Sequence, residues 1–256
     1  MILYFSGTGN SRAVATLLGQ LLKEPVSFIL DQNPRERRFT GKYLIIVFPI
    51  YSWGIAPVLL DYIRGFSPEF IREVREVPVY AVCTCGDDTG MAMEMMVKAL
   101  DYSGLRLRGS WSVQMPNNYV LLPGFDVDTV NVEEDKLERF PARVKHIAEV
   151  IARGEGETDV TLGSFPRLKT RIVYPLFKKW GIAPSRWQAT DACVGCGKCE
   201  RSCTTGNIRI DKASGHPVWG SNCVSCLACY HVCPVNAVQY GRATKGKGQY
   251  WCKVKL

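Results

Sequence analysis

The first part of the chain contains four short, almost wholly apolar runs, at positions 2–5, 26–30, 43–48 and 79–83. Runs of this length predict β-strands, and the lack of polar alternation is typical of parallel strands that are buried on both faces. Positions 105–115, where apolar residues are interspersed with polar ones, are predicted as a fifth strand.

Between these runs, apolar residues recur every three or four positions, which predicts helices. They do so at 14–21, 58–63, 91–100 and 131–153. For the last helix, Asn131 and Glu134 resemble a capping box, and Arg153-Gly154 predicts the end. Strands that alternate with helices predict an α/β domain with a doubly wound, parallel, five-stranded sheet. In such a sheet the ligand site lies in the loops at the carboxyl ends of the strands.

The alternation stops between residues 154 and 187. Pro175 predicts that no single unbroken helix spans this segment. We expect a basic and apolar linker packed across two domains, and a docking surface or a helix at a membrane edge is the alternative. Basic and large apolar residues are interleaved here: Arg167, Leu168, Lys169, Arg171, Ile172, Phe177, Lys178, Lys179, Trp180 and Arg186.

The composition allows one large or two modest domains, with 256 residues of which 46% are apolar. No apolar stretch approaches the roughly 20 residues of a membrane span, and the first residues do not resemble a signal peptide. We therefore expect a cytoplasmic protein with no membrane span. The formal charge of +8 suggests a nucleic acid or an acidic partner.

Eight of the eleven cysteines form two runs of the pattern C-x2-C-x2-C-x3-C, thirty residues apart. This spacing is typical of two [4Fe–4S] clusters, in which the fourth cysteine of each run binds the cluster of the other run. A pair of zinc sites is the alternative, because four thiolates also suit zinc. On the iron–sulfur interpretation, the first cluster is held by Cys193, Cys196, Cys199 and Cys233, and the second by Cys223, Cys226, Cys229 and Cys203.

The cysteine block resembles the bacterial two-cluster ferredoxins, and Cys233-Pro234 matches the Cys-Pro of that family. In the first run, Thr204 stands in place of the proline. We expect its hydroxyl to raise the potential of the cluster that Cys203 binds. Two such clusters, each of about −2 charge, would reduce the net charge to about +4, which weakens the case for nucleic acid. The basic segment 242–255 is expected to be a solvated tail, with an acidic partner as the alternative.

The stretch "SGTGNS", Ser6–Ser11, joins the first strand to the first helix in a way that suits a phosphate. It lacks the lysine of an ATP or GTP loop. A dinucleotide loop would have glycine where Arg12 stands, although Asp31 lies where a ribose ligand is expected. The third candidate is FMN, whose phosphate suits hydroxyls and an amide at a helix start.

This loop resembles the flavodoxin phosphate loop [ST]-x-T-G-N-[ST]. Two further loops follow strands, and both are similar to flavodoxin loops: "PIYSWGIAP" at 49–57 and "TCGDDTG" at 84–90. The resemblance implies that Trp53 stacks on the flavin ring and that the Gly54 peptide bonds the flavin N5. The FMN-binding residues that it implies are Ser6, Gly7, Thr8, Gly9, Asn10, Ser11, Pro49, Tyr51, Ser52, Trp53, Gly54, Thr84, Cys85, Gly86 and Asp87.

One position departs from the flavodoxin pattern. Gly90 stands where a second stacking tyrosine is expected. We expect Tyr51 or the stretch 115–119 to cover that face of the flavin, or the face to be open to a reactant. Cys83 and Cys85 are expected to be buried thiols beside the loop. His146, His216 and His231 are expected to be structural or exposed.

The whole chain resembles the EFR1-type flavodoxin–ferredoxin fusion proteins. This implies a flavodoxin-like FMN domain over 1–153, a linker over 154–187 and a small α+β ferredoxin-like domain over 188–256. We expect an electron-transfer flavoprotein that couples one- and two-electron chemistry and serves a redox partner such as a ferredoxin, a flavodoxin or a reductase. The alternative is a flavin-dependent reductase of a quinone or enone. No catalytic side chain is assigned, since no Ser-His-Asp or paired-carboxylate arrangement is present in the sequence.

Overall fold

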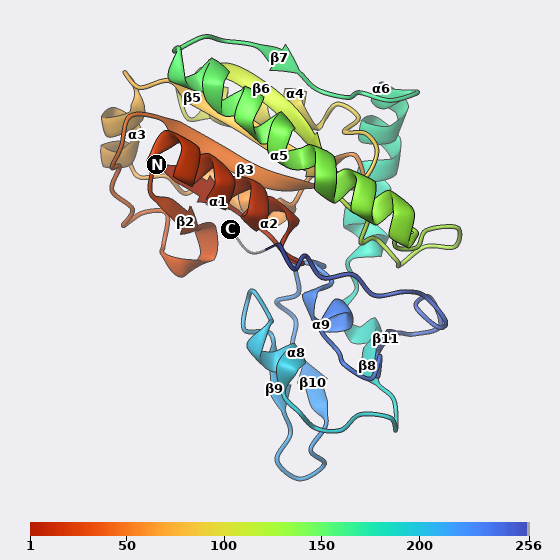
Figure 1. The fold of residues 1–256 in the computed structure, drawn as a ribbon. Coiled ribbons are helices and arrows are strands. Elements are labelled where there is room, and N and C mark those ends of the chain that lie inside the picture. The colour runs from red at the N-terminus through yellow and green to blue at the C-terminus, as the bar shows by residue number, and fades with distance from the viewer. Residues whose placement is uncertain (255–256) are drawn as a thin grey trace.

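The N-terminal region is built on a mainly parallel sheet, which the computed structural model describes together with the rest of residues 1–254. The strand order is β2-β1-β3-β5-β6-β7 (Figure 1). If the short strand β4 is left out and the strands are renumbered, β2-β1-β3-β5-β6 becomes the flavodoxin-like order 2-1-3-4-5. All five predicted strands are therefore confirmed: β1 (Ile2–Tyr4), β2 (Val26–Phe28), β3 (Leu44–Tyr51), β5 (Val79–Cys85) and β6 (Leu107–Gln114).

The sheet has two short additions that the apolar pattern did not predict. Strand β4 (Gly54–Ile55) folds back antiparallel on the end of β3, and β7 (Thr158–Asp159) runs parallel to β6 at the edge. Each has only two residues, which is too short for a periodic signal.

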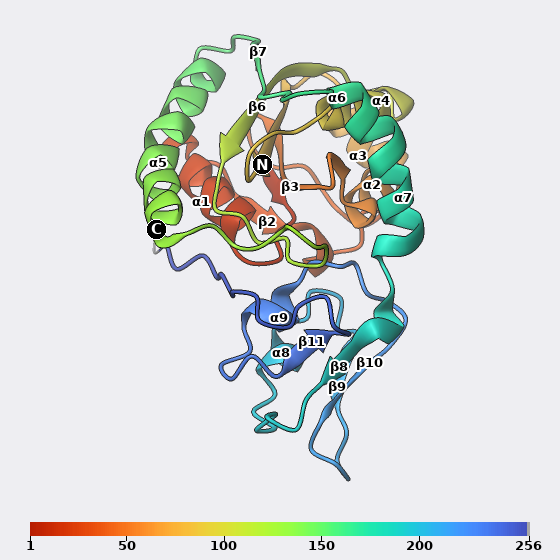
Figure 2. The ribbon, with the colours of Figure 1, turned by 90° about the vertical axis from the view of Figure 1, so that its right-hand side faces the viewer.

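Helices cover both faces of the sheet, because side chains alternate along each buried strand (Figure 2). Ile45 and Val47 pack toward helices α1 (Asn10–Leu22) and α5 (Val130–Ala152). Ile46 and Phe48 belong to the core on the opposite face. The helices of that face are α2 (Pro57–Arg64), α3 (Pro68–Val74) and α4 (Ala92–Tyr102), and a turn of 3-10 helix, η1 (Ile29–Asp31), follows β2.

Helix α5 begins earlier than predicted. Its N-cap is Thr129, whose side chain makes no capping hydrogen bond, and Asn131 lies within the first turn. The capping-box prediction is therefore wrong, since Asn131 does not stand at the cap position. The predicted end is confirmed: Arg153 is the C-cap and Gly154 has φ of 68°.

Residues 166–181, called the linker helix below, form one continuous helical segment. It consists of α6 (Pro166–Leu168), η2 (Lys169–Val173), α7 (Tyr174–Leu176) and η3 (Phe177–Gly181), of which η2 and η3 are π-helical. The prediction that Pro175 prevents an unbroken helix is wrong. Pro175 has no N–H and lies within α7, between the two π-helical turns. In these turns the backbone forms i→i+5 hydrogen bonds, so the groups around Pro175 have other partners than in an α-helix.

The C-terminal region is a small α+β unit beside the carboxyl ends of the sheet strands (Figure 1). A turn of 3-10 helix, η4 (Pro184–Arg186), leads into it. Strand β8 (Trp187–Ala189) pairs with β11 (Val238–Tyr240), and β9 (Ile208–Ile210) pairs with β10 (Pro217–Trp219). The short helices α8 (Lys198–Arg201) and α9 (Ala228–His231) lie within the two cysteine runs.

The segment 247–252 returns to the sheet domain and joins its core. Tyr250 and Cys252 are buried in the cluster formed by α1 and α5. The Lys247 ammonium donates to the carbonyls of Val120 and Leu122, both at 2.6 Å. The prediction of a solvated tail is therefore wrong for this segment. Burial of the Tyr250 ring holds it against the sheet domain, although the neighbouring residues are basic. Lys255 lies outside the described residues.

Tyr250 provides a test of this attachment. Its ring is 3% exposed and its hydroxyl donates to Asn10 Oδ1 at 2.6 Å. We expect Tyr250→Ala to lower the free energy of unfolding by about 3–5 kcal/mol, and Tyr250→Phe by about 1 kcal/mol, in urea denaturation. The control is Tyr102→Ala, because that side chain is 83% exposed. Equal midpoints for Tyr250→Ala and Tyr102→Ala would show that the segment adds no stability.

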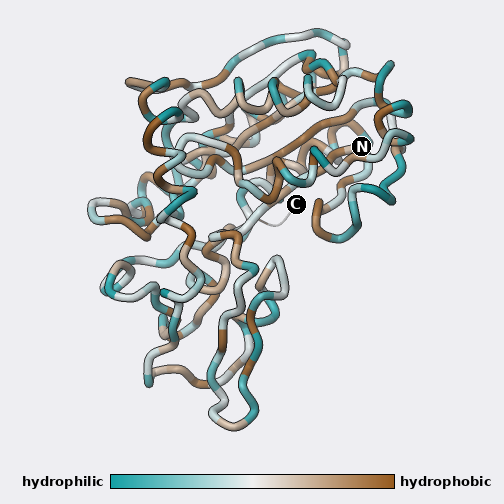
Figure 3. Tube along the Cα trace, turned by 180° about the vertical axis from the view of Figure 1, so that it is seen from behind, coloured by the Kyte–Doolittle hydropathy of each residue, from teal (hydrophilic) through white to brown (hydrophobic). Residues whose placement is uncertain are grey.

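Two further observations complete the fold. Apolar segments run through the sheet, whereas the helices alternate between apolar and polar residues (Figure 3). None of the helices within residues 1–254 has the length and apolar character needed to cross a membrane.

Candidate functional site

A pocket lies where the carboxyl ends of β1, β3 and β5 meet the C-terminal region. The three loops predicted to bind FMN all contribute to it, together with the segment after β6. Of the predicted residues, Gly9, Trp53, Gly54 and Asp87 do not line it. The lining residues are Ser6, Gly7, Thr8, Asn10, Ser11, Pro49, Ile50, Tyr51, Ser52, Thr84, Cys85, Gly86, Pro116, Asn117, Asn118, Tyr119, Phe177, Ser225, Cys226 and Leu227.

The phosphate loop offers unpaired backbone donors to this pocket. Within residues 1–254, the N–H groups of Gly7, Thr8, Asn10 and Ser11 donate to no other protein atom. They lie at the N-terminus of α1, where the helix dipole also favours an anion. The donor set therefore fits a phosphate group.

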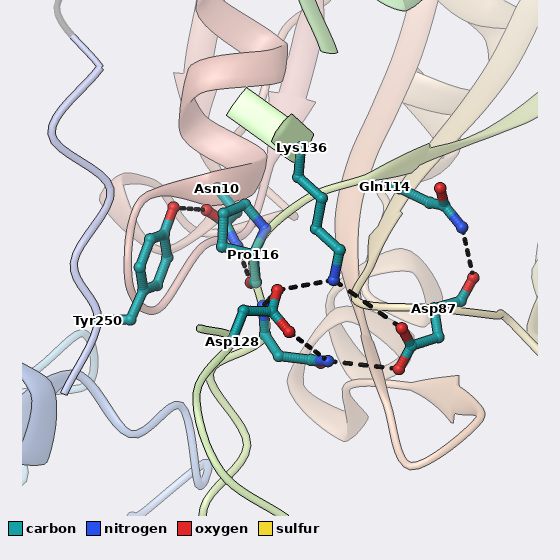
Figure 4. Close-up of polar contacts among 8 residues, drawn as sticks. Asn10, Asp87, Gln114, Pro116, Asp128, Lys136 and Tyr250 are labelled. Carbon is teal, nitrogen blue, oxygen red and sulfur yellow. Dashed lines mark hydrogen bonds and ion pairs between the residues drawn. The ribbon is translucent and has the colours of Figure 1, made fainter. Parts of the chain in front are cut away.

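The side chains of the loop are held in place by the protein itself. The Ser11 hydroxyl bonds the Thr84 hydroxyl at 2.7 Å. The Asn10 amide donates to the Pro116 carbonyl at 2.9 Å and accepts from the Tyr250 hydroxyl (Figure 4). These side chains shape the loop, so a phosphate would be bound chiefly by backbone N–H groups.

The other end of the pocket is aromatic. Phe177 of the linker helix lies between Tyr51 and Tyr119, with ring centroids 6.3 and 6.2 Å away. The enclosed volume is about 90 Å³. Ligand pockets usually measure roughly 300–1,000 Å³, so a flavin ring requires movement of side chains that line this pocket.

Trp53 and Gly54 lie under the linker helix instead of in the pocket lining. The Trp53 carbonyl accepts from the Thr170 hydroxyl at 2.6 Å. The ring of Tyr174 lies so close to Gly54 that an added Cβ would be 2.3 Å from it. The linker helix also packs closely against Gly90, where an added Cβ would lie 2.7 Å from the Thr170 hydroxyl.

Asp87 belongs to a polar network beside the pocket (Figure 4). Its carboxylate accepts from the Asn117 amide at 3.3 Å and lies 3.9 Å from the Lys136 ammonium, which is 2.7 Å from Asp128. The Gln114 amide donates to the Asp87 carbonyl at 3.0 Å. This network fixes the segment after β6 against the third loop. Lys136 and Asp128 could not be identified from the sequence, since neither belongs to a motif.

Three groups near the pocket are buried and electrically neutral. Cys83 and Cys85 are buried as predicted, and burial raises the pKa of Cys85 to about 12. Burial lowers the pKa of His231 to about 4. Its Nδ1 accepts from the Tyr250 N–H at 3.1 Å, so its Nε2 donates to the Asn118 carbonyl at 2.8 Å. His231 is therefore structural, as expected, and it joins the two regions of the chain.

The cysteines lie in the two sets that the spacing indicated. Cys193, Cys196 and Cys199 line one small cavity together with Cys233 of the second run. In the other set, burial raises the pKa of Cys229, and the neighbouring Cys226, Cys223 and Cys203 raise it further. Among residues 1–254, no three His, Cys, Asp or Glu side chains converge closely enough to bind a single metal ion.

The second set of cysteines touches the pocket directly. Cys226 lines it, and a Cβ added to Gly7 would lie 2.3 Å from the Cys226 carbonyl oxygen. Glycine is needed at this position because the two backbones approach so closely. The phosphate loop and the second cysteine run are therefore in contact.

Hydroxyl groups lie near the sulfur atoms of the second set. The Thr204 hydroxyl is 3.5 Å from the Cys226 sulfur, and the Thr205 hydroxyl is 3.8 Å from that of Cys203. At the equivalent position of the second run, Pro234 follows Cys233 and has no hydroxyl. The two sets therefore differ in their polar surroundings.

Comparisons with known proteins support these assignments in part. Residues 188–240 match the 4Fe–4S dicluster domain family. Comparison with the curated proteins found no match. Similar solved structures include a rubredoxin oxygen:oxidoreductase from Desulfovibrio gigas, with 14% identity over 60% of this chain and 35% of that chain (TM-score 0.40). A Fusobacterium nucleatum flavodoxin bound to flavin mononucleotide has 13% identity over 60% of this chain and 96% of that chain (TM-score 0.40).

These structural likenesses are weak, and the fold assignment rests on the strand order of the sheet. A flavodoxin-like α/β region is followed by a 4Fe–4S dicluster domain. This is the organisation of a flavodoxin–ferredoxin fusion, as predicted.

The Thr204 hydroxyl yields a prediction for such an iron–sulfur site. A hydrogen bond to a ligand sulfur favours the reduced cluster. We expect Thr204→Val to lower the potential of the cluster at the second set by tens of millivolts, and Thr204→Ser to leave it nearly unchanged. An anaerobic redox titration followed by EPR measures both potentials, and the cluster at the first set is the internal control. Equal shifts at both clusters would contradict a local effect of the hydroxyl.

Proposed function

We propose that the protein is an electron-transfer flavoprotein that binds FMN and two [4Fe–4S] clusters and exchanges electrons with an external redox partner. The observation that carries this proposal is that one pocket is lined both by the phosphate loop and by Cys226. A flavin site and an iron–sulfur site in contact would exchange electrons without diffusional encounter.

The residues of the pocket divide into a phosphate end and a ring end. The N–H groups of Gly7, Thr8, Asn10 and Ser11 would hold the phosphate. Tyr51 and Tyr119 line the end of the pocket that would hold the ring. Trp53 and Gly54, for which the resemblance to flavodoxins implies contacts with the ring, lie outside the pocket lining. When bound, FMN supplies redox chemistry with one or two electrons.

The protein also limits proton exchange in the pocket. Burial raises the pKa of Tyr51 well above its usual value, with a further contribution from Cys226 and Cys223. Burial likewise raises the pKa of Cys85 to about 12. Both groups keep their protons at neutral pH, so they present neutral surfaces to the pocket.

The two cysteine sets connect the pocket to the molecular surface. Cys196 of the first set is exposed, whereas Cys226 of the second lies at the pocket. This arrangement suits an external protein partner, such as a ferredoxin, a flavodoxin or a reductase, that approaches the first set. The eight cysteines divide as Cys193, Cys196, Cys199 and Cys233, and Cys223, Cys226, Cys229 and Cys203.

Cofactor analysis of anaerobically purified protein tests the proposal. We expect about one FMN and about eight iron atoms per chain, with visible and EPR spectra of both cofactor types. Colourless protein, or protein with zinc and no iron, would overturn it. Steady turnover of a quinone or enone would favour the reductase alternative, for which the close packing at Gly90 offers no support.

A further inference from the structure

The linker helix is fixed to the sheet domain by its inner face. The Thr170 hydroxyl donates to the Trp53 carbonyl and accepts from the Met91 N–H at 2.8 Å. The Lys169 ammonium pairs with Asp88 at 2.6 Å, and the Tyr174 hydroxyl donates to the Ile55 carbonyl at 2.6 Å. These contacts hold the helix in one orientation, so its outer face is defined.

The outer face carries a stripe of exposed apolar side chains, called the apolar stripe below. Residues four apart lie on the same side of a helix, as Leu168, Ile172, Leu176 and Trp180 do, and Phe165 directly precedes the helix. In Figure 2, α6 and α7 run along the outer edge of the molecule. The stripe consists of Phe165, Leu168, Ile172, Leu176 and Trp180, which are 77%, 53%, 51%, 44% and 60% exposed.

Basic residues border the apolar stripe, and acidic residues are absent from this segment of the sequence. Arg167 and Arg171 are exposed on the first half of the helix, and Lys178 and Lys179 on the second. No Asp or Glu occurs from residue 160 to residue 190. Lys179 lies over the ring of Trp180, 4.9 Å from its centre, at one end of the stripe. The outer face is therefore apolar along its centre and positive along its borders.

We propose that the apolar stripe and its basic border bind the surface of a bilayer that contains anionic lipids, with the linker helix lying parallel to the membrane. Phe and Trp at the ends of a line of Leu and Ile side chains suit the boundary between headgroups and acyl chains. Lys and Arg on the borders reach lipid phosphates while their aliphatic stems stay near the apolar phase.

A bilayer fits this face better than an acidic protein does. An acidic protein would satisfy the basic border, but it would also have to cover five exposed apolar side chains. A lipid surface satisfies both features at once, because headgroups and acyl chains lie at adjacent depths. The proposal uses only protein surface and does not depend on the bound cofactors.

Vesicle binding tests the proposal with the full-length holoprotein. We expect sedimentation with phosphatidylglycerol–phosphatidylcholine vesicles and much weaker binding to phosphatidylcholine alone or at high salt. The double variant Arg167→Gln/Arg171→Gln should bind about thirtyfold more weakly, because each charge contributes about fivefold. Ile172→Ser/Trp180→Ser should lose at least tenfold.

Matched control variants show whether a loss of vesicle binding is specific to this face or comes from the overall charge and hydrophobicity of the protein. Lys98→Gln/Lys145→Gln removes two exposed charges elsewhere, and Val218→Ser removes an apolar side chain that is 56% exposed. Both should bind as the parent protein does. Trp180 adds an independent signal, because a blue shift of emission on vesicle binding should be present in the parent protein and reduced in Trp180→Phe.

The proposal is overturned if the protein fails to bind anionic vesicles at low salt. It is also overturned if the control variants lose as much affinity as the stripe variants. Binding of an acidic redox protein through the same residues, without vesicle binding, would assign the face to a protein partner instead.

Discussion

Replacing Cys226 by serine is expected to halve the iron content of the protein, from about eight to about four atoms per chain. The serine hydroxyl is a poor ligand for iron, and Cys226 lies in the set of cysteines at the pocket. Because the side chain volume changes little, the flavin content should be retained. Iron analysis and visible absorption of the anaerobic protein measure the result.

Further serine variants test the crossed assignment of the cysteines. Cys203→Ser should leave the same residual EPR spectrum as Cys226→Ser, although Cys203 belongs to the first run. Cys233→Ser should match Cys196→Ser. Cys252→Ser is the control, since this buried thiol belongs to neither set. If Cys203→Ser instead matched Cys196→Ser, each run would bind its own cluster.

Replacing Ser6 by aspartate is expected to weaken FMN binding roughly a thousandfold. Ser6 lines the pocket, and its hydroxyl accepts from the Gly9 N–H at 3.2 Å. An aspartate can keep this hydrogen bond but adds a negative charge beside the phosphate. At about 4 Å and an effective dielectric constant near 20, the repulsion is about 4 kcal/mol.

Ser6→Asn is the matched variant, because its amide oxygen also accepts a hydrogen bond and carries no charge. Its FMN affinity should stay within about tenfold of the parent protein. Fluorescence titration of the flavin-free protein measures both affinities, and iron content shows that the C-terminal region is intact. Similar affinities for Ser6→Asp and Ser6→Asn would mean that no phosphate is bound here.

The sheet was predictable because its strands are buried on both faces. Runs such as 43–48 and 79–83 have no polar positions, and a parallel strand of this kind has a strong sequence signal. The convergence of the three loops on one pocket could also be predicted, because the carboxyl ends of parallel strands meet at one edge of the sheet. The cysteine spacing predicted that Cys233 belongs with the first run, and the structure places it beside Cys193, Cys196 and Cys199.

Tertiary contacts decided the features that the sequence did not show. Helix α5 starts at Val130 without side-chain capping, and the linker helix passes Pro175 because its inner face is anchored by Thr170 and Tyr174. Tyr250 is buried although its neighbours are basic. In each case, contacts with residues far away in the sequence outweighed a local preference.

The positions of Trp53 and Asp87 outside the pocket lining could not be predicted from the local sequence either. The motif placed both in loops beside the pocket, but the linker helix and Lys136 determine what these residues contact. Asp128 and Lys136 occur in a loop and a helix without any motif, so only the folded chain brings them to the third loop.

The contact between Cys252 and the phosphate loop has a consequence for biosynthesis. The Cys252 N–H donates to the Thr8 carbonyl at 2.9 Å, and a Cβ added to Gly9 would lie 2.9 Å from the Cys252 Cβ. The loop is translated early, yet one of its walls is supplied by a segment that leaves the ribosome long afterwards. The phosphate loop therefore has all its packing contacts only after residue 252 has been translated.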